Sequence, residues 1–323
     1  MGVVRIKENL AFPKVVLIDT VSYCNLRCSM CSHKDMKRKK GIMEWSLFKK
    51  IIDEVSRNDK STRVWMVFFG EALIIKRTKP SIFDMLSYAK RAGLKEVVLN
   101  TNGVLLDRES SEKLIDAGLD GIFIGIDAFC EETYEKIRCG GDYRRVVQNV
   151  LDLIDVKQKK GADKFNIRVQ FVEMEENRRE RDAFTQYWLS KGVDVKIRQK
   201  LSWAGLSGEA AGGSWDKRHE CYWIMDTMSI TDTGDVAICA ADPEARFVAG
   251  NLARQSIREI WNGKLKEVRE LHKKREWEKL PYPCSQCGDW EVSYKDRMIR
   301  ARRKGVIRGR IKRYLSRFTY LAD

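Results

Sequence analysis

The chain has 323 residues, of which 43% are hydrophobic and 33% are charged, so it is long enough to bury one large core or two smaller ones. Its N-terminal stretch carries a charge every few residues, and no apolar run approaches the roughly 20 residues that a bilayer span requires. These features exclude a membrane span and a signal peptide, and we expect a cytoplasmic protein whose nine cysteines are reduced. The net charge of +15 favours anionic partners.

From Pro13 onward, short β-branched runs alternate with longer amphipathic runs. The amphipathic runs have the apolar period of helices, and several of them stop at glycine. This repeat of strand and helix predicts right-handed crossovers and a parallel sheet. The predicted buried strands are residues 15–19, 64–69, 96–101, 121–127, 165–172 and 193–199.

Two parallel architectures fit this pattern, a barrel and an open doubly wound sheet. The first strand is followed by a cysteine cluster and lacks GxGxxG, which disfavours a dinucleotide fold. We therefore predict an α/β chain with a partial (β/α)6 TIM-like barrel over residues 1–205.

The periodic pattern ends after Gln199. A connector rich in glycine, serine and alanine is followed by a hairpin that turns at residues 232–234 and by a helix over residues 255–280, interrupted near Gly263. We predict a small α+β module over residues 206–290 and a basic tail over residues 291–323.

Three cysteines crowd into the stretch YCNLRCSMC: Cys24, Cys28 and Cys31. An odd number does not make a disulfide framework, and a structural zinc site requires four nearby ligands. The segment between them is too polar for buried core thiols. At CxxxCxxC spacing on a loop that leaves a parallel strand, they can hold three corners of a [4Fe–4S] cluster and leave the fourth iron open.

The segment CNLRCSMC resembles the signature of the radical S-adenosylmethionine (SAM) enzymes, whose fold is a partial (β/α)6 barrel. The resemblance implies that SAM binds the open iron through its amino and carboxylate groups. It also implies that an electron from the cluster cleaves SAM to give a 5′-deoxyadenosyl radical.

Further family elements follow in the expected order. FGEA is similar to the family's GGEP, with alanine in place of proline; NTNG is similar to TNG; GIDA is similar to SxDG, with Gly125 in place of serine; and YEKIRCGGDY is similar to YxxIRGG. The strand ends are where barrel enzymes place their chemistry. The resemblance implies that SAM is bound by Met30, Gly70, Glu71, Asn100, Asn102, Asp127, Arg138 and Gln170. Glu71 would bind the ammonium of SAM and Arg138 its carboxylate. Met30 would pack on the adenine, and Gln170 would contact the ribose.

Each of these assignments has a structural alternative. Glu71 alone is compatible with a solvated strand end, and Asn102 with a simple turn. Arg138 is compatible with a helix-face arginine, and Gln170 with a pairing inside the barrel. Their register with the three cysteines favours the functional interpretation for the first two and leaves the last two open.

Four more thiols lie in the C-terminal module: Cys221, Cys239, Cys284 and Cys287. Their spacing alone suits either zinc or a second iron–sulfur cluster. The surrounding sequence is similar to the auxiliary modules called SPASM or, when shortened, twitch. Full SPASM modules use seven cysteines, so four imply one auxiliary [4Fe–4S] cluster and two [4Fe–4S] clusters in all.

We therefore expect a radical SAM oxidoreductase whose auxiliary cluster accepts an electron from the substrate, with a sugar or cyclitol alcohol as the favoured substrate. Arg198 and Trp203 are candidates for substrate contact or for packing at the barrel rim. Cys139 is a candidate hydrogen-atom donor, as in radical epimerases, or, like Cys130, an incidental thiol. The alternatives are a radical SAM peptide maturase that epimerises or crosslinks a ribosomal peptide, and a non-catalytic iron–sulfur or zinc protein.

Basic residues are concentrated in two places. The run SHKDMKRKK after the first cysteines is compatible with a solvated loop or with docking of a flavodoxin or ferredoxin. The tail from Lys295 supplies +9 of the net charge, and its apolar stripe suits a helix that covers the barrel or one that meets anionic lipid. An anionic, nucleotide-linked or lipid-linked substrate fits this charge, whereas no RNA-binding motif accompanies it.

Overall fold

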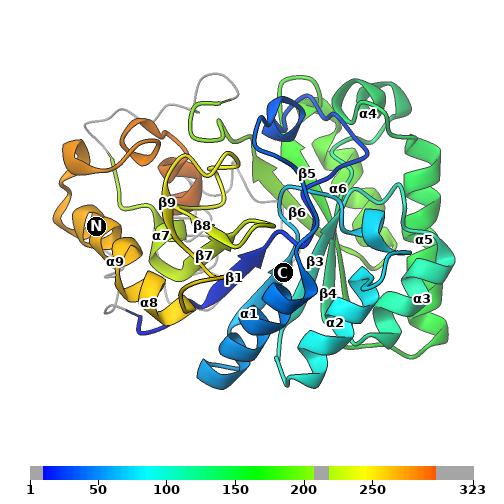
Figure 1. Ribbon diagram of the computed structural model, residues 1–323. Helices are drawn as coiled ribbons and strands as arrows, with labels where there is room; N and C mark the ends of the chain where they lie inside the picture. The colour runs from blue at the N-terminus through cyan, green and yellow to red at the C-terminus, as the bar shows by residue number, and fades with distance from the viewer. Residues whose placement is uncertain (1–9, 207–217, 296–323) are drawn as a thin grey trace, which may run out of the picture.

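The computed structural model describes residues 10–206 and 218–295, and its centre is one nine-stranded sheet (Figure 1). Strands β1 to β6 are parallel and lie side by side in chain order. They are β1 (Val15–Ile18), β2 (Arg63–Met66), β3 (Val97–Thr101), β4 (Gly121–Gly125), β5 (Asn166–Glu173) and β6 (Asp194–Gln199). All six predicted strands are present, and they are parallel as the alternating pattern indicated.

A helix follows each of the first five strands before the chain returns to the sheet. These helices are α1 (Trp45–Asn58), α2 (Ile82–Arg91), α3 (Arg108–Asp116), α5 (Tyr143–Lys159) and α6 (Arg181–Ser190). An additional short helix, α4 (Glu131–Ile137), precedes α5 and was not predicted as a separate element. Only the first residue of the IRCGG stretch, Ile137, belongs to this helix, and Arg138 follows directly after it.

Alternation of side chains along the strands separates two apolar layers. Val16 and Ile18 of β1 point to the large core shared with the helices, where α1 buries Phe48 and Ile52. The other strand face carries a second cluster inside the curve of the sheet, made by Leu17, Trp65, Val98, Phe123 and Ala240. The interior of the partial barrel is therefore packed in its lower part by large side chains, which leaves the strand ends for polar groups.

The C-terminal module continues the same sheet. Strand β7 (Thr227–Ile230) pairs in parallel with β1, and β8 (Asp235–Ala237) and β9 (Val248–Asn251) follow antiparallel. Helices α7 (Tyr222–Asp226), α8 (Ile257–Asn262) and α9 (Lys264–Lys274) complete the module, seen in yellow and orange beside β1 in Figure 1. The helix predicted over residues 255–280 is thus interrupted at Gly263, as expected. The boundary at residue 205 stays a prediction, because the sheet runs across both units.

The described residues contain no helix that is both long and apolar enough to cross a membrane. The expected helix of the basic tail lies outside the described residues, as do residues 207–217 of the connector.

Candidate active site

The three-cysteine loop leaves the carboxyl end of β1. Cys24, Cys28 and Cys31 pack with Leu26, Met30 and Met174 in a small buried cluster of their own. Burial, with a smaller contribution from the neighbouring thiols, raises the pKa of Cys31 to about 12. Three thiols that repel one another as thiolates fit a cationic iron group, which would stabilise all three at once.

Arg138 directly follows helix α4, and its side chain reaches the three-cysteine loop. Its Nη1 donates to Cys28 Sγ at 3.6 Å, and its Nη2 forms an ion pair with the fully buried Asp127. Burial lowers the pKa of Arg138, but the Asp127 carboxylate together with the neighbouring Cys28 and Tyr134 outweighs burial, so the net shift of the pKa is upward. The guanidinium therefore points into the site and not along a helix face.

Gly125 explains one departure from the family pattern. A Cβ at this position would overlap with Nη2 of Arg138, so even the side chain of alanine or serine needs space that the guanidinium occupies. Asp127 is held in turn by the backbone N–H of Val172, which donates to its Oδ1 at 2.6 Å. The glycine, the aspartate and the arginine therefore form one unit.

Glu71, at the end of β2, is buried and not solvated, since its side chain is 1% exposed. It accepts hydrogen bonds from the Asn102 N–H at 2.7 Å and from the Thr101 hydroxyl at 2.9 Å. Burial raises its pKa. The carboxylate therefore fixes the ends of β2 and β3 together, and it lies where the resemblance expects a group for an ammonium.

Asn102 connects β3 to the cysteine loop. Its side-chain amide donates to Asn25 Oδ1 at 2.9 Å and lies 3.9 Å from Cys24 Sγ. At the neighbouring strand end, a Cβ on Gly70 would overlap with the Val21 carbonyl. The close approach of the loop backbone therefore requires glycine there.

Three predicted residues form a polar chain across the inner face of the sheet. Arg198 Nη1 donates to Gln170 Oε1 at 2.7 Å, and Gln170 Nε2 donates to Asn100 Oδ1 at 3.3 Å. The structure thus brings together one candidate for substrate contact and two candidates for SAM contact, from β6, β5 and β3. Gln170 therefore pairs within the barrel, as predicted by the structural alternative to its contact with SAM.

Met30 and Trp203 are joined directly. The Trp203 indole N–H donates to the Met30 carbonyl at 2.8 Å, and its ring packs against Phe69 with centroids 5.4 Å apart. The first residues of the connector are therefore anchored on the cysteine loop. Trp203 serves as packing at the barrel rim in this arrangement.

Cys130 and Cys139 lie apart from the two thiol sets and are both exposed. The Cys139 thiol donates to the Lys136 carbonyl at 3.4 Å, while its own carbonyl accepts from the Arg27 N–H at 3.0 Å. The backbone of Cys139 thus supports the cysteine loop, and its role as a hydrogen-atom donor stays a prediction.

The four module cysteines line one cavity of about 420 Å³, which we call the auxiliary cavity. Burial raises the pKa of each thiol, and together with the neighbouring Cys221 it raises the pKa of Cys284 to about 12. Four buried thiols around one space are the donor set of an iron–sulfur cluster. Among the described residues, no three or more His, Cys, Asp or Glu side chains converge around a point that a single metal ion could occupy.

Sequence reasoning missed two residues that contact this thiol set. His272 Nε2 lies 3.2 Å from Cys284 Sγ, and the Cys221 N–H donates to His272 Nδ1 at 3.4 Å. The Arg218 guanidinium donates to the Cys284 carbonyl at 2.8 Å. A single histidine on a basic helix and an arginine in a connector carry no motif, so no signal in the sequence distinguishes them.

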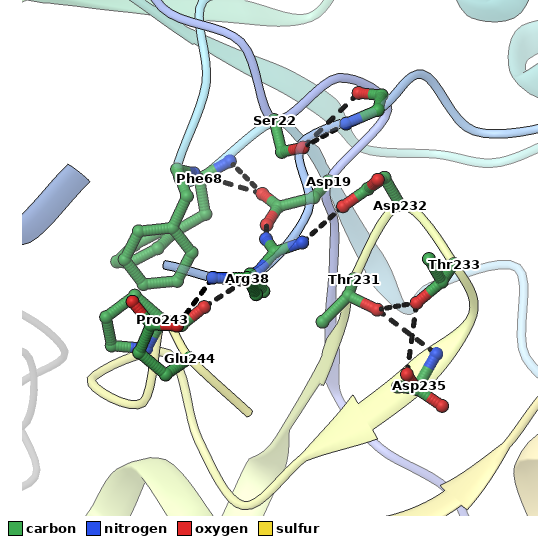
Figure 2. Close-up of polar contacts among 12 residues, drawn as sticks. Asp19, Ser22, Arg38, Phe68, Thr231, Asp232, Thr233, Asp235, Pro243 and Glu244 are labelled. Atoms are coloured by element: carbon green, nitrogen blue, oxygen red, sulfur yellow. Dashed lines mark hydrogen bonds and ion pairs between the residues drawn. The ribbon is translucent and has the colours of Figure 1, made fainter. Parts of the chain in front are cut away.

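Arg38 bridges the cysteine loop and the module, as Figure 2 shows. Its guanidinium forms ion pairs with Asp19 at the end of β1 and with Asp232 in the β7–β8 turn, and its Nε donates to the Pro243 carbonyl at 2.7 Å. The backbone N–H groups of Lys37 and Arg38 donate to the Glu244 carboxylate at 2.6 and 2.9 Å. One arginine of the basic run is therefore structural, while Lys34, Lys37 and Lys39 are exposed.

A second, small cavity lies at this junction, and we call it the junction cavity. Asp19, Phe68 and Phe69 line it from the ends of β1 and β2, and Cys239 of the auxiliary set lines it from the module. It therefore lies between the strand ends that carry the three-cysteine loop and the auxiliary thiols.

Comparison with known proteins agrees with this geometry. Residues 18–178 match the radical SAM superfamily, and residues 221–288 match an iron–sulfur cluster-binding domain of SPASM type. The curated relatives include a tungsten-containing aldehyde ferredoxin oxidoreductase cofactor-modifying protein of Pyrococcus furiosus, 27% identical over 58% of this chain and 51% of its own length. A probable GTP 3′,8-cyclase of Methanococcus maripaludis is 30% identical over 41% of this chain and 43% of its own length. The matches thus span about half the length of these relatives.

Solved structures share the fold at low identity. SuiB of Streptococcus suis, bound to the precursor peptide SuiA, has a TM-score of 0.67 at 13% identity over 88% of this chain and 71% of its own. BtrN in complex with AdoMet and 2-DOIA has a TM-score of 0.60 at 16% identity over 85% of this chain and 92% of its own. The partial-barrel fold class with a small C-terminal module is thereby confirmed. The two family models together match well over half of the chain, which therefore belongs to the radical SAM superfamily and carries a C-terminal iron–sulfur cluster-binding module.

Proposed function

We propose that the chain is a radical SAM oxidoreductase that dehydrogenates a sugar or cyclitol alcohol at the junction between the barrel strand ends and the C-terminal module. Cys24, Cys28 and Cys31 would hold one [4Fe–4S] cluster, and the four thiols of the auxiliary cavity would hold a second. When bound, the first cluster and SAM would supply a radical that removes a hydrogen atom from the substrate carbon, and the second cluster would accept one electron. A base takes up the hydroxyl proton, so that the alcohol becomes a carbonyl group.

The observation that carries this proposal is the lining of the junction cavity. Cys239 belongs to the auxiliary thiols and reaches the same space as Asp19 and Phe69 from the three-cysteine side. A substrate in this space lies next to an auxiliary ligand, which suits direct transfer of an electron from the substrate. A second cluster with only a structural role would not need one of its cysteine ligands to line the junction cavity.

The residues of the chain have separate roles in this proposal. Arg138 and Glu71 are placed to bind the carboxylate and ammonium of SAM beside the three thiols. Asn100, Gln170 and Arg198 form the polar wall of the barrel interior. Phe68 and Phe69 cover the junction cavity with apolar surface and exclude water from it.

The first experiment compares anaerobically reconstituted wild type with Cys24→Ala/Cys28→Ala/Cys31→Ala and Cys239→Ala variants. We expect about eight irons per chain in the wild type and about four in the triple variant, which should also form no 5′-deoxyadenosine. The Cys239→Ala variant should still cleave SAM but give no two-electron-oxidised product. Cys130→Ala, which removes an exposed thiol outside both sets, is the matched control.

Two results would contradict the proposal. About four irons and one zinc in the wild type would remove the auxiliary electron acceptor. Conversion of a ribosomal peptide, and of no sugar or cyclitol alcohol, would replace the substrate class with that of a peptide maturase.

A further inference from the structure

We propose that a third cavity, at the open side of the barrel, binds the phosphate group of the substrate. This inference rests on the proposed function, because it names the substrate class of the same enzyme. The cavity has a volume of about 690 Å³ and is called the lumen cavity here.

Residues from both sides of the barrel opening line the lumen cavity. Leu17 and Trp65 contribute from β1 and β2, Lys196 and Arg198 from β6, and Trp223 from α7 of the module. In the sheet, β6 and β1 lie on opposite sides of β2 to β5, so the cavity is where the curved sheet brings its first and last barrel strands face to face. The module contributes to the same wall.

The charge of this lining is positive. Arg63, Lys196 and Arg198 line the cavity, and Asp226 is the acidic residue among the lining side chains. Asp226 accepts a hydrogen bond from the Thr227 hydroxyl at 2.9 Å. Glu96, outside the lining, pairs with Arg63 Nη2 at 2.6 Å, and the lining itself holds three basic residues and one acidic residue. A ligand with negative charge is therefore favoured.

The hydrogen-bonding groups of the lumen cavity further limit the chemical class of the ligand. Arg63 Nε and the indole N–H of Trp65 are buried and have no hydrogen-bond partner among the described residues. Both groups can donate but not accept, as can the ammonium of Lys196 and the guanidinium of Arg198. A phosphate offers several acceptor oxygens and needs no acceptor in return, whereas a neutral hydroxyl would bring a donor of its own.

The apolar part of the lining indicates how the rest of the substrate lies. Trp65, Phe68 and Trp223 form an aromatic wall in the lumen cavity. Leu17, Phe68 and Ala240 line both the lumen cavity and the junction cavity, so the two spaces adjoin. A substrate with its phosphate at the cations would extend along the aromatic wall and place its alcohol between the two thiol sets.

The test measures binding of inorganic pyrophosphate to the full reconstituted chain with SAM, by calorimetry at low salt. We expect the Arg63→Gln/Lys196→Gln double variant to bind at least tenfold more weakly than the wild type. The matched control is Arg168→Gln. Arg168 lies on the same inner face of the sheet and pairs with Asp194 at 2.6 Å, but it does not line the lumen cavity. Its affinity should equal that of the wild type.

Three results would overturn the inference. Equal affinity in all proteins would assign binding to other basic residues of the chain, and absence of saturable binding would leave the cavity without a phosphate site. Displacement of pyrophosphate by citrate at equal concentration would indicate a carboxylate site. A charge-conserving Arg63→Lys/Lys196→Arg variant should keep most of the affinity, and iron content and thermal unfolding verify that each variant is folded.

Pyrophosphate binding does not depend on SAM cleavage. The experiments can therefore contradict the phosphate site without contradicting the proposed function, and the reverse. A wild type that binds pyrophosphate at the lumen cavity but yields no oxidised alcohol would contradict the proposed function alone. A wild type that oxidises an uncharged alcohol and ignores pyrophosphate would contradict the phosphate site alone.

Discussion

The two thiol sets of this chain lie in contrasting surroundings. The three loop thiols are bordered by polar side chains from several strand ends, among them Glu71, Asn102 and Arg138. The four module thiols are enclosed by apolar side chains together with His272 and Arg218, and they line a cavity of their own. The first environment suits a site that exchanges a charged ligand, and the second suits a site that only exchanges electrons.

Arg38 is the residue that connects these regions, and its removal should have the largest effect. Arg38→Leu leaves Asp19 and Asp232, both buried, without their cation, which should lower the free energy of unfolding by about 3–5 kcal/mol. Chemical denaturation of the reconstituted protein measures this loss. Lys39→Leu, at an exposed position of the same loop, should change stability by less than about 0.5 kcal/mol. Equal stability of the two variants would show that the bridge does not hold the regions together.

Gly125→Ala should disturb the three-cysteine region alone. The added methyl group displaces the Arg138 guanidinium, and loss of its charge-assisted hydrogen bonds should weaken SAM binding by roughly 10- to 100-fold. Equilibrium dialysis with SAM measures the change. Gly121→Ala on the same strand, whose Cβ would meet its nearest neighbour at 3.4 Å, is the matched control. A normal SAM affinity in Gly125→Ala would refute the assignment of Arg138.

Variants of the exposed lysines in the basic run test reduction of the first cluster separately from its assembly. We propose that Lys34, Lys37 and Lys39 dock an acidic flavodoxin or ferredoxin. Their replacement by glutamate should slow reduction by flavodoxin about tenfold or more at low salt and leave reduction by dithionite unchanged. Arg38 stays intact in this variant, because it belongs to the bridge. Equal slowing with both reductants would instead indicate damage to the loop.

His272→Gln should affect the auxiliary region and leave SAM cleavage intact, with the smallest effect of the four. The histidine lies 3.2 Å from Cys284 Sγ, and contacts to the sulfur ligands tune the potential of an iron–sulfur cluster. We expect a shift in the midpoint potential of the auxiliary cluster in a redox titration followed by EPR. His219→Gln, whose ring stacks on Tyr294, is the control within the same module. A shift in the potential of the loop cluster would contradict the separation of the two regions.

Local patterns were sufficient for the strands and for the thiols. The β-branched runs predicted all six barrel strands because buried parallel strands are apolar on both faces. The CxxxCxxC spacing pointed to the three loop cysteines because they lie close in sequence on one loop, and CSQC pointed to Cys284 and Cys287 for the same reason. In contrast, the short helix α4 and the parallel pairing of β7 with β1 depend on partners far along the chain, and neither was predicted.

The sequence by itself therefore determined the family, the order of the parallel strands and the identity of the cysteines, because each follows from residue types at short spacing. The tertiary structure decided that Arg38 bridges the cysteine loop and the module, that Gly125 leaves room for Arg138, and that His272 contacts the auxiliary thiols. It also decided that Arg63, Lys196 and Arg198 share one cavity. These are contacts between residues far apart in the chain, and their geometry arises only when the sheet curves and the module packs against its first strand.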